Sequence, residues 1–304
     1  FTLNSGIRTS YWSFNQELLI SPRINIAYLP LWKKDIIFRA ASGIYYQAPF
    51  YKEIKNIEGQ LNKNIKSQKS THFVFGTDYL FYSWGRPFKL ISELYYKKLE
   101  NLIPYKLDNV RIQYLAENNS NGYATGLDLK INGEFVTGVE SWASLSIMQT
   151  REDIENDFYI NEVGEIVYPG YIPRPTDQRI NFSMFFQDYI PKNPNYKMHL
   201  NLIYGTGLPF GPPNSEKYQD ILRIPDYRRV DIGFSTVLKN TNKKSKIQWL
   251  NHFNSIWVSA EIFNLLNIDN TVSYLWVSDI TGRQYAVPNY LTARQLNFKL
   301  NINF

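Results

Sequence analysis

The chain has 304 residues, a formal net charge of +6 and no cysteine. The lack of cysteine excludes disulfides, cysteine nucleophiles and thiolate metal sites. No run of about 18 apolar residues occurs, so a transmembrane helix is excluded as well. Aromatic residues make up 16% of the chain, yet the mean hydropathy is −0.35. This combination fits a membrane β-barrel, and it equally fits a secreted all-β carbohydrate-binding protein.

Segments in which apolar and polar residues alternate recur along the chain, as expected for strands with one apolar face and one polar face. In the first, Leu3, Ile7 and Tyr11 share one face while Arg8 lies on the other. No convincing helical period interrupts the series. The twelve predicted strands are 3–11, 23–28, 38–46, 72–81, 87–97, 121–131, 139–150, 179–189, 196–205, 227–238, 254–264 and 292–304.

The predicted strands are long for a soluble protein. Most run over about 10–13 residues, whereas strands of soluble sandwiches average about five or six. At about 3.3 Å per residue and a tilt near 40°, ten residues rise about 25 Å, which is the height of an outer-membrane apolar band. Strand length therefore favours a transmembrane antiparallel β-barrel over a sandwich.

The connections alternate in length, which a barrel with short periplasmic turns and long outer loops explains. Two depart from the rule, because the first outer loop (about 12–17) is short and the turn 239–253 is long. The basic run 239–246 in that turn is interpreted as a solvated surface. This pattern predicts extracellular long loops and a periplasmic C-terminus. The short connections are 30–35, 82–87, 132–138 and 190–195, and the long ones are about 47–67, 98–120, 151–178, 206–226 and 265–291.

Charged residues on the polar strand faces need no buried partner if those faces meet water or a plug inside a barrel. Face assignment alone selects five of them as lumen- or plug-facing residues: Arg8, Arg23, Arg39, Asp128 and Glu261.

Specific segments resemble TonB-dependent outer-membrane receptors. The stretch 259–267 (SAEIFNLLN), followed by Asn270, Thr271 and Tyr274, resembles the family's penultimate strand and the loop after it. The closing TARQLNFKLNINF is similar to the family's final strand. SPRINIAYLP, FRAASGIYYQAPFYKEI, GYATGLDLKI, YIPRPTDQR, GLPFGPPN and YRRVDIGF also resemble its strands and loops.

The resemblance extends over residues 1–304 and implies the C-terminal part of a 22-stranded barrel. Nothing in the chain resembles the family's plug or TonB box, and a complete 12-stranded barrel is the alternative. The implied terminal signal for the barrel-insertion machinery comprises Phe298, Leu300, Ile302 and Phe304.

The implied function is energised uptake of a scarce nutrient across the outer membrane of a Gram-negative cell. In the family, TonB and its inner-membrane complex act on the plug, and the nutrient is an iron chelate, cobalamin, a glycan or a peptide. The barrel itself contacts outer-membrane lipid. A barrel that acts as a scaffold or docking partner without transport is the alternative function.

Residues of the outer loops are candidates for a ligand-binding rim. Prolines in 171–179 and 207–214 favour ordered loops, and loop aromatics could stack on a ligand. The candidates are Tyr51, Tyr171, Arg174, Phe210 and Trp276. Structural roles, such as turning the chain or filling loop cores, are the competing interpretation of each.

Enzymatic, metal and nucleic-acid functions have little support in the sequence. His72, His199 and His252 lack metal-ligand spacing, and the acidic stretch 151–157 lacks the spacing of a calcium loop. No G-x-S-x-G element or glycine-rich phosphate loop occurs. We therefore expect a non-enzyme without a cofactor, a metal site or a nucleic-acid partner.

Overall fold

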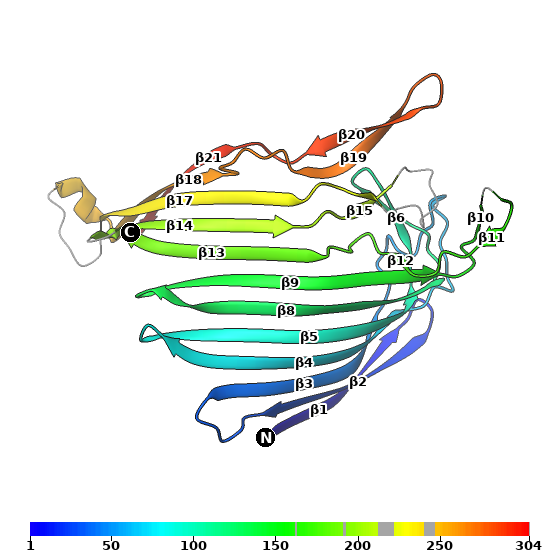
Figure 1. The fold of residues 1–304 in the computed structure, drawn as a ribbon, viewed down its shortest axis with the longest axis horizontal. Coiled ribbons are helices and arrows are strands. Elements are labelled where there is room, and N and C mark those ends of the chain that lie inside the picture. The colour runs from blue at the N-terminus through cyan, green and yellow to red at the C-terminus, as the bar shows by residue number, and fades with distance from the viewer. Residues whose placement is uncertain (162, 191–192, 212–221, 240–246, 304) are drawn as a thin grey trace.

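One antiparallel sheet dominates the computed structural model, which describes residues 1–161, 163–190, 193–211, 222–239 and 247–303. Twelve long strands follow one another across this sheet in chain order (Figure 1). They are β1 (Thr2–Trp12), β2 (Glu17–Tyr28), β3 (Asp35–Gln47), β4 (Gln68–Ser83), β5 (Arg86–Leu102), β8 (Ser120–Val136), β9 (Val139–Ile154), β13 (Ile180–Ile190), β14 (Asn193–Gly205), β17 (Tyr227–Lys239), β18 (Ser255–Phe263) and β21 (Gln295–Asn303).

The twelve strands coincide with the twelve predicted from alternation, which confirms the all-β fold class. Several are longer than predicted, because β4 and β5 are separated only by residues 84–85 and β8 and β9 only by 137–138. Gly85 and Gly138 have φ of +71° and +79°. Residues without a Cβ adopt this conformation readily, so the chain can reverse within two residues. The segments 82–87 and 132–138, predicted as turns, therefore lie mostly within strands.

The long connections carry small elements of their own, all at one end of the sheet (Figure 1). They pair as short hairpins, apart from β12, which pairs with β9. The elements are β6 (Tyr105–Asp108), β7 (Arg111–Tyr114), β10 (Tyr159–Ile160), β11 (Ile166–Val167), β12 (Ile172–Pro173), β15 (Pro209–Phe210), β16 (Leu222–Arg223), β19 (Thr271–Ser278) and β20 (Gln284–Tyr290). Near the other end lies the 3₁₀ helix η2 (Gln248–His252).

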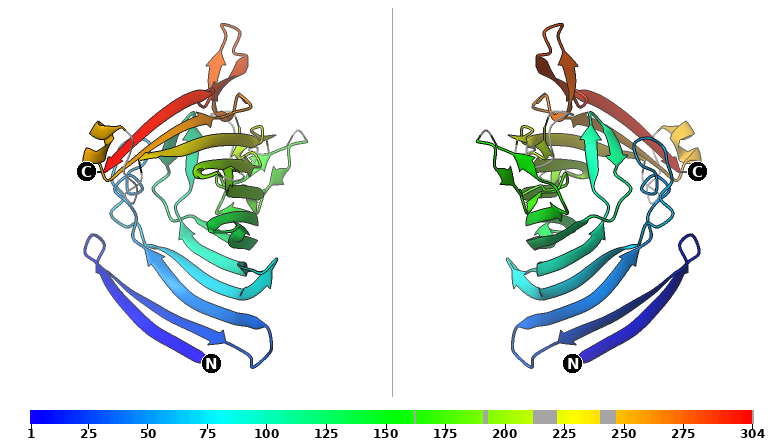
Figure 2. Two further views of the ribbon diagram at one scale, coloured as in Figure 1. Left: turned by 90° about the vertical axis from the view of Figure 1, so that its left-hand side faces the viewer. Right: turned by 90° about the vertical axis from the view of Figure 1, so that its right-hand side faces the viewer.

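The sheet curves into a trough, and the long connections 48–67 and 103–119 lie toward its concave side at one end (Figure 2). Among the described residues, β1 pairs within this sheet only with β2, and β21 only with β18. The two edges of the trough therefore do not pair with each other. The helical residues that the structure describes include no segment with the length and apolar character of a membrane span.

The convex face of β18 and β21 is apolar. Leu296, Phe298 and Leu300 of β21 face Ile262, Ala260 and Val258 of β18 in register, and these three β21 side chains are exposed. Ile302 continues the same face, opposite Ile256. Phe304, predicted as part of the same terminal signal, lies outside the described residues. A role of the strand in assembly stays a prediction.

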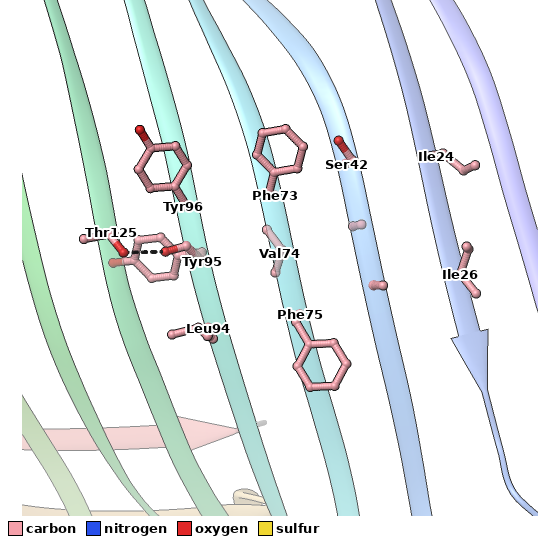
Figure 3. Close-up of a pocket in the computed structure, with 12 residues that line it drawn as sticks. Ile24, Ile26, Ser42, Phe73, Val74, Phe75, Leu94, Tyr95, Tyr96 and Thr125 are labelled. Atoms are coloured by element: carbon pink, nitrogen blue, oxygen red, sulfur yellow. Dashed lines mark hydrogen bonds between the residues drawn. The ribbon is translucent and has the colours of Figure 1, made fainter.

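A shallow apolar depression of about 500 Å³ lies on this convex face, over the middle of β3 (Figure 3). The small side chain of Ser42 leaves room between Ile24 and Ile26 on one side and Phe73 and Phe75 on the other. Its side walls belong to the apolar strand faces, which the sequence predicts to meet lipid.

One cluster of buried apolar residues lies within two of the long connections. Ile54, Ile65, Ile103 and Ala116 form it, and Trp12 and Tyr114 pack against it. All four buried residues come from the connections 48–67 and 103–119. These two connections are therefore packed together as one unit over the end of strands β3 to β8.

Candidate functional site

The five residues predicted to face the lumen all lie on the polar face of the sheet, as the strand register shows. Arg8 is exposed near one edge, opposite Ser21. Arg23 lies with its guanidinium 4.4 Å from the ring centroid of Tyr45. Contact of any of these residues with a plug stays a prediction.

Arg39 belongs to a charge network that crosses three strands. Its Nη2 lies 2.6 Å from Asp78 Oδ1 and 3.1 Å from Glu93 Oε1. Lys89 Nζ lies 2.7 Å from the other oxygen of Asp78. Gly76 separates Arg39 from Glu93 in register, and a Cβ there would lie 3.2 Å from Glu93 Cγ. The missing side chain of Gly76 therefore gives the Arg39–Glu93 pair its room.

The same arrangement recurs on the other half of the sheet. His199 and Glu261 both face Gly233 in register, and His199 Nε2 lies 3.7 Å from Glu261 Oε1. A Cβ at Gly233 would lie 2.2 Å from the imidazole Cε1. The Asn297 amide donates to Glu261 at 2.9 Å. Glu261 thus contacts His199 of β14, across Gly233, and Asn297 of β21.

Asp128, the remaining predicted residue, accepts a hydrogen bond of 2.5 Å from the hydroxyl of Ser146. It faces Glu93 in register, which places it next to the Arg39 network. A cavity of about 340 Å³ on this face is lined by Glu93, Asp128, Ser146 and Lys130. The sequence predicted Arg39 and Asp128 separately, and the structure brings them to neighbouring positions on one face.

The glycines of this face were not predicted as functional residues. Gly76 and Gly233 occupy polar-face positions in strands whose apolar and polar residues alternate. Glycine inside a strand weakens it and often marks the close approach of another group. A glycine at a polar-face position of a long strand was the signal that could have found them.

A chamber of about 680 Å³ lies at the loop end of the concave face. Tyr105 and Tyr114 of the β6–β7 hairpin line it together with Glu53, His72 and Arg174. Glu53 is nearly buried, and it accepts hydrogen bonds from the backbone amide of Phe50 at 2.6 Å and from the Gln68 side chain at 3.2 Å. The chamber is therefore polar and aromatic, with its carboxylate fixed in place.

Burial raises the pKa of both tyrosines of the chamber, and nearby Glu53 adds to the rise at Tyr114. At Tyr105 the positive charge of Arg174 opposes this effect, and the negative charge of Glu152 adds to it. Both phenols are therefore neutral hydrogen-bond donors at neutral pH.

A buried acid holds two of the long connections to the sheet. Asp177 is fully buried, and its carboxylate accepts from the Thr150 amide at 2.8 Å and lies 2.9 Å from Arg179 and 2.5 Å from Arg223. Arg223 also donates to the carbonyls of Asp177 and Gly207 at 2.6 and 2.9 Å. The loop 155–179, the connection 206–226 and β9 therefore meet at one carboxylate.

Arg174, a predicted rim residue, also holds the loop 155–179 to β9. Its Nε lies 3.3 Å from Glu152, which is almost completely buried on β9. Arg174 thus holds its loop and also lines the chamber. The contact with Glu152 supports a structural role, and ligand binding by Arg174 stays a prediction.

The other predicted rim residues separate into three places. Phe210 stacks on Tyr274 at a centroid distance of 4.6 Å and lies 6.3 Å from Trp276. Tyr171 packs against Tyr123 at 5.4 Å, toward the convex side of β8. Tyr51 is exposed beside the β6–β7 hairpin, far from this aromatic cluster in the sequence. Phe210 and Trp276 are therefore brought together, whereas Tyr51 contacts Lys55 and Tyr171 contacts Tyr123.

A contact across the mouth of the trough was not predicted. Asn109, at the tip of the β6–β7 hairpin, accepts hydrogen bonds from Ser273 at 2.7 Å and from Asn289 at 2.6 Å. Ser273 and Asn289 belong to the β19–β20 hairpin, whose parent strands β18 and β21 lie several strands away from β5 and β8. We call this contact the Asn109 bridge.

Within the described ranges, no group of three or more histidine, aspartate or glutamate residues could hold a metal ion. The polar face and the chamber are suited to hydrogen bonding and charge recognition of a solute.

The fold resembles solved outer-membrane proteins. The outer membrane transporter YddB from Escherichia coli aligns with 99% of this chain at a TM-score of 0.66 and 14% identity. The copper transporter OprC aligns with 95% at 0.62 and 14% identity, and the siderophore receptor PiuA from Acinetobacter baumannii aligns with 95% at 0.62 and 15% identity. The chain spans 43%, 40% and 36% of the lengths of these three proteins.

No family model matches the sequence, and no curated protein matches it. The solved structures that match include TonB-dependent outer-membrane receptors. The chain therefore has the fold of part of the transmembrane β-barrel of this class of receptor.

Proposed function

We propose that this chain is the C-terminal wall and part of the outer loops of a TonB-dependent receptor that imports a scarce nutrient across the outer membrane. The observation that carries the proposal is the trough of twelve long strands, which aligns almost entirely with about two fifths of such receptors. In this proposal the barrel has 22 strands, and a plug occupies the concave face.

The polar concave face supports this role. Charged groups such as Arg39, Glu93 and Glu261 are partly exposed there, so they can exchange their partners for water or for a plug at small cost. Loops rich in hydrogen bonds cover one end of the face and provide a chamber for a solute. Long loops would lie outside the cell, and the short turns and the C-terminus in the periplasm.

The proposal makes TonB and its inner-membrane complex the energy source, and the substrate an iron chelate, cobalamin, a glycan or a peptide. The test is growth of a strain without this protein on limiting amounts of each nutrient class, next to a strain without TonB. We expect both strains to fail on the same nutrient, and the intact gene to restore growth of the first.

Normal growth of the strain without this protein on every nutrient, when the parent strain does carry the protein in its outer membrane, would contradict transport. The non-transporting scaffold would then be the better assignment. Crosslinking of the protein in intact cells would be the next measurement, since a scaffold needs a constant protein partner.

A further inference from the structure

The outer loops contain a second cavity, separate from the chamber, with a distinct chemistry. It has a volume of about 700 Å³ and lies between the connection 48–67 and the β6–β7 hairpin. We propose that this cleft is the first binding site for an anionic solute that carries a sugar ring or an aromatic ring. The inference rests on the proposed function, and it specifies the class of substrate.

The charge of the cleft is the first argument. Lys52 and Lys55 line one side and Arg111 lines the other. None of the residues that line the cleft carries a carboxylate. The neighbouring acid Glu53 points elsewhere, because its oxygens bind the Phe50 amide and Gln68 beside the chamber. The two walls therefore present three positive charges to a solute between them.

The lysines of the cleft are not neutralised by a carboxylate in the described part of the chain. In the part of the chain that the structure describes, the ion pairs include neither Lys52 nor Lys55. Lys55 instead donates to the hydroxyl of Tyr51, and its ammonium lies 4.4 Å from the centroid of that ring. A solute with carboxylate, sulfate or phosphate groups would provide the stronger, charge-assisted partner.

Aromatic groups explain why the solute needs a ring. Tyr51 is 69% exposed at the edge of the cleft, so a sugar or an aromatic ring can pack against it. Tyr114 lines both the cleft and the chamber, so the two cavities meet at this side chain. A solute bound first in the cleft is therefore next to the chamber over the concave face.

Two kinds of solute have this chemistry, namely a sulfated or carboxylated sugar and an anionic aromatic metal chelate. The experiment measures binding to the intact receptor, purified in detergent, by calorimetry. The probes are a sulfated disaccharide, the ferric complex of catechol disulfonate, and neutral maltohexaose. We expect one anionic probe to bind and maltohexaose not to bind, and the identity of that probe distinguishes the two solutes.

Two matched double variants locate the binding. Lys52→Gln/Lys55→Gln removes two charges from the cleft, and we expect the affinity to fall by about 30-fold. Lys33→Gln/Lys34→Gln removes two exposed charges from a short turn at the opposite end of the sheet, and we expect no change. Arg111→Gln on the facing hairpin should weaken binding by about 10-fold.

Equal binding of an anionic probe by the wild type and by Lys52→Gln/Lys55→Gln would overturn the assignment, as would no binding of either anion. Heat-modifiable migration in gel electrophoresis checks that each variant forms a folded barrel. A receptor that supports TonB-dependent growth but binds neither anion refutes the cleft alone. Anion binding that needs Lys52 and Lys55, without any growth phenotype, refutes uptake alone.

Discussion

At the scale of single residues, glycines decide where charges can meet on the concave face. The Arg39–Glu93 and His199–Glu261 pairs each reach across a strand over a position without a side chain. Each pair is partly exposed, so each contributes only about 0.2–1 kcal/mol to stability. The glycines therefore matter more for the shape and the charge pattern of the face than for the free energy of unfolding.

The variant Gly76→Val tests this role. Its branched side chain would crowd Glu93 and the Ser92 carbonyl, which lie 3.2 Å from an added Cβ. We expect a destabilisation of about 1–3 kcal/mol and loss of the Arg39–Glu93 contact. Thermal unfolding of the purified protein gives the comparison. Gly6→Val is the matched control, because an added Cβ at Gly6 has no neighbour within 4 Å, and a similar loss in both variants would contradict the argument.

At the scale of elements, the long loops are packed and hydrogen-bonded. The loop 155–179 is held at Asp177, and the hairpins β6–β7 and β19–β20 are joined by the Asn109 bridge. The sequence predicted where the long loops begin and end, because strand alternation stops there. Their internal contacts join residues up to 180 positions apart, and no local pattern encodes a partner at that distance.

We expect Asp177→Ala to loosen the loop 155–179. The substitution leaves Arg179 and Arg223 without their buried carboxylate, at a cost of about 3–5 kcal/mol. Faster cleavage by a protease within the loop, in the folded protein, is the expected result. Glu155→Ala changes an exposed acid of the same loop and should leave the cleavage rate unchanged. Equal rates for wild type and Asp177→Ala would show that the carboxylate does not hold the loop.

We expect Asn109→Gly to release the two hairpins from each other. Asn109 has φ of +56°, which glycine adopts without strain, so the variant removes only the side-chain contacts. Two lost hydrogen bonds cost about 1–3 kcal/mol, which corresponds to a shift of roughly 5- to 150-fold toward separated hairpins.

Spin labels at Val110→Cys and Ile280→Cys measure that separation, and the natural chain has no cysteine to interfere. A narrow distance distribution should broaden in Asn109→Gly. Asn156→Gly, at another positive φ, is the control. An unchanged distribution in Asn109→Gly would refute the bridge as a restraint.

At the scale of the whole molecule, the sequence predicted the fold more completely than the site. Side chains of a barrel strand meet lipid or lumen in strict alternation, so the face of Arg39 or Phe298 follows from its position alone. The site depends on how loops fold over the mouth. Phe210 and Trp276 were predicted as separate rim residues, and only the structure shows that they share one aromatic cluster.

The orientation of the molecule is the remaining prediction at this scale. Asn156→Cys lies in an exposed long loop and Lys33→Cys in an exposed short turn. In intact cells, a reagent that does not cross the outer membrane should label Asn156→Cys and spare Lys33→Cys. Both should react after lysis. The reverse pattern in intact cells would place the short turns outside the cell.

The Asn109 bridge also has an evolutionary consequence. The segments 103–119 and 265–294 occupy distant parts of the chain, yet one side chain joins their hairpins across the mouth. A deletion that shortens either hairpin would leave the other without its partner, so related proteins should change the lengths of the two segments together. Grafting one outer loop from another receptor would then fail where grafting the two together succeeds.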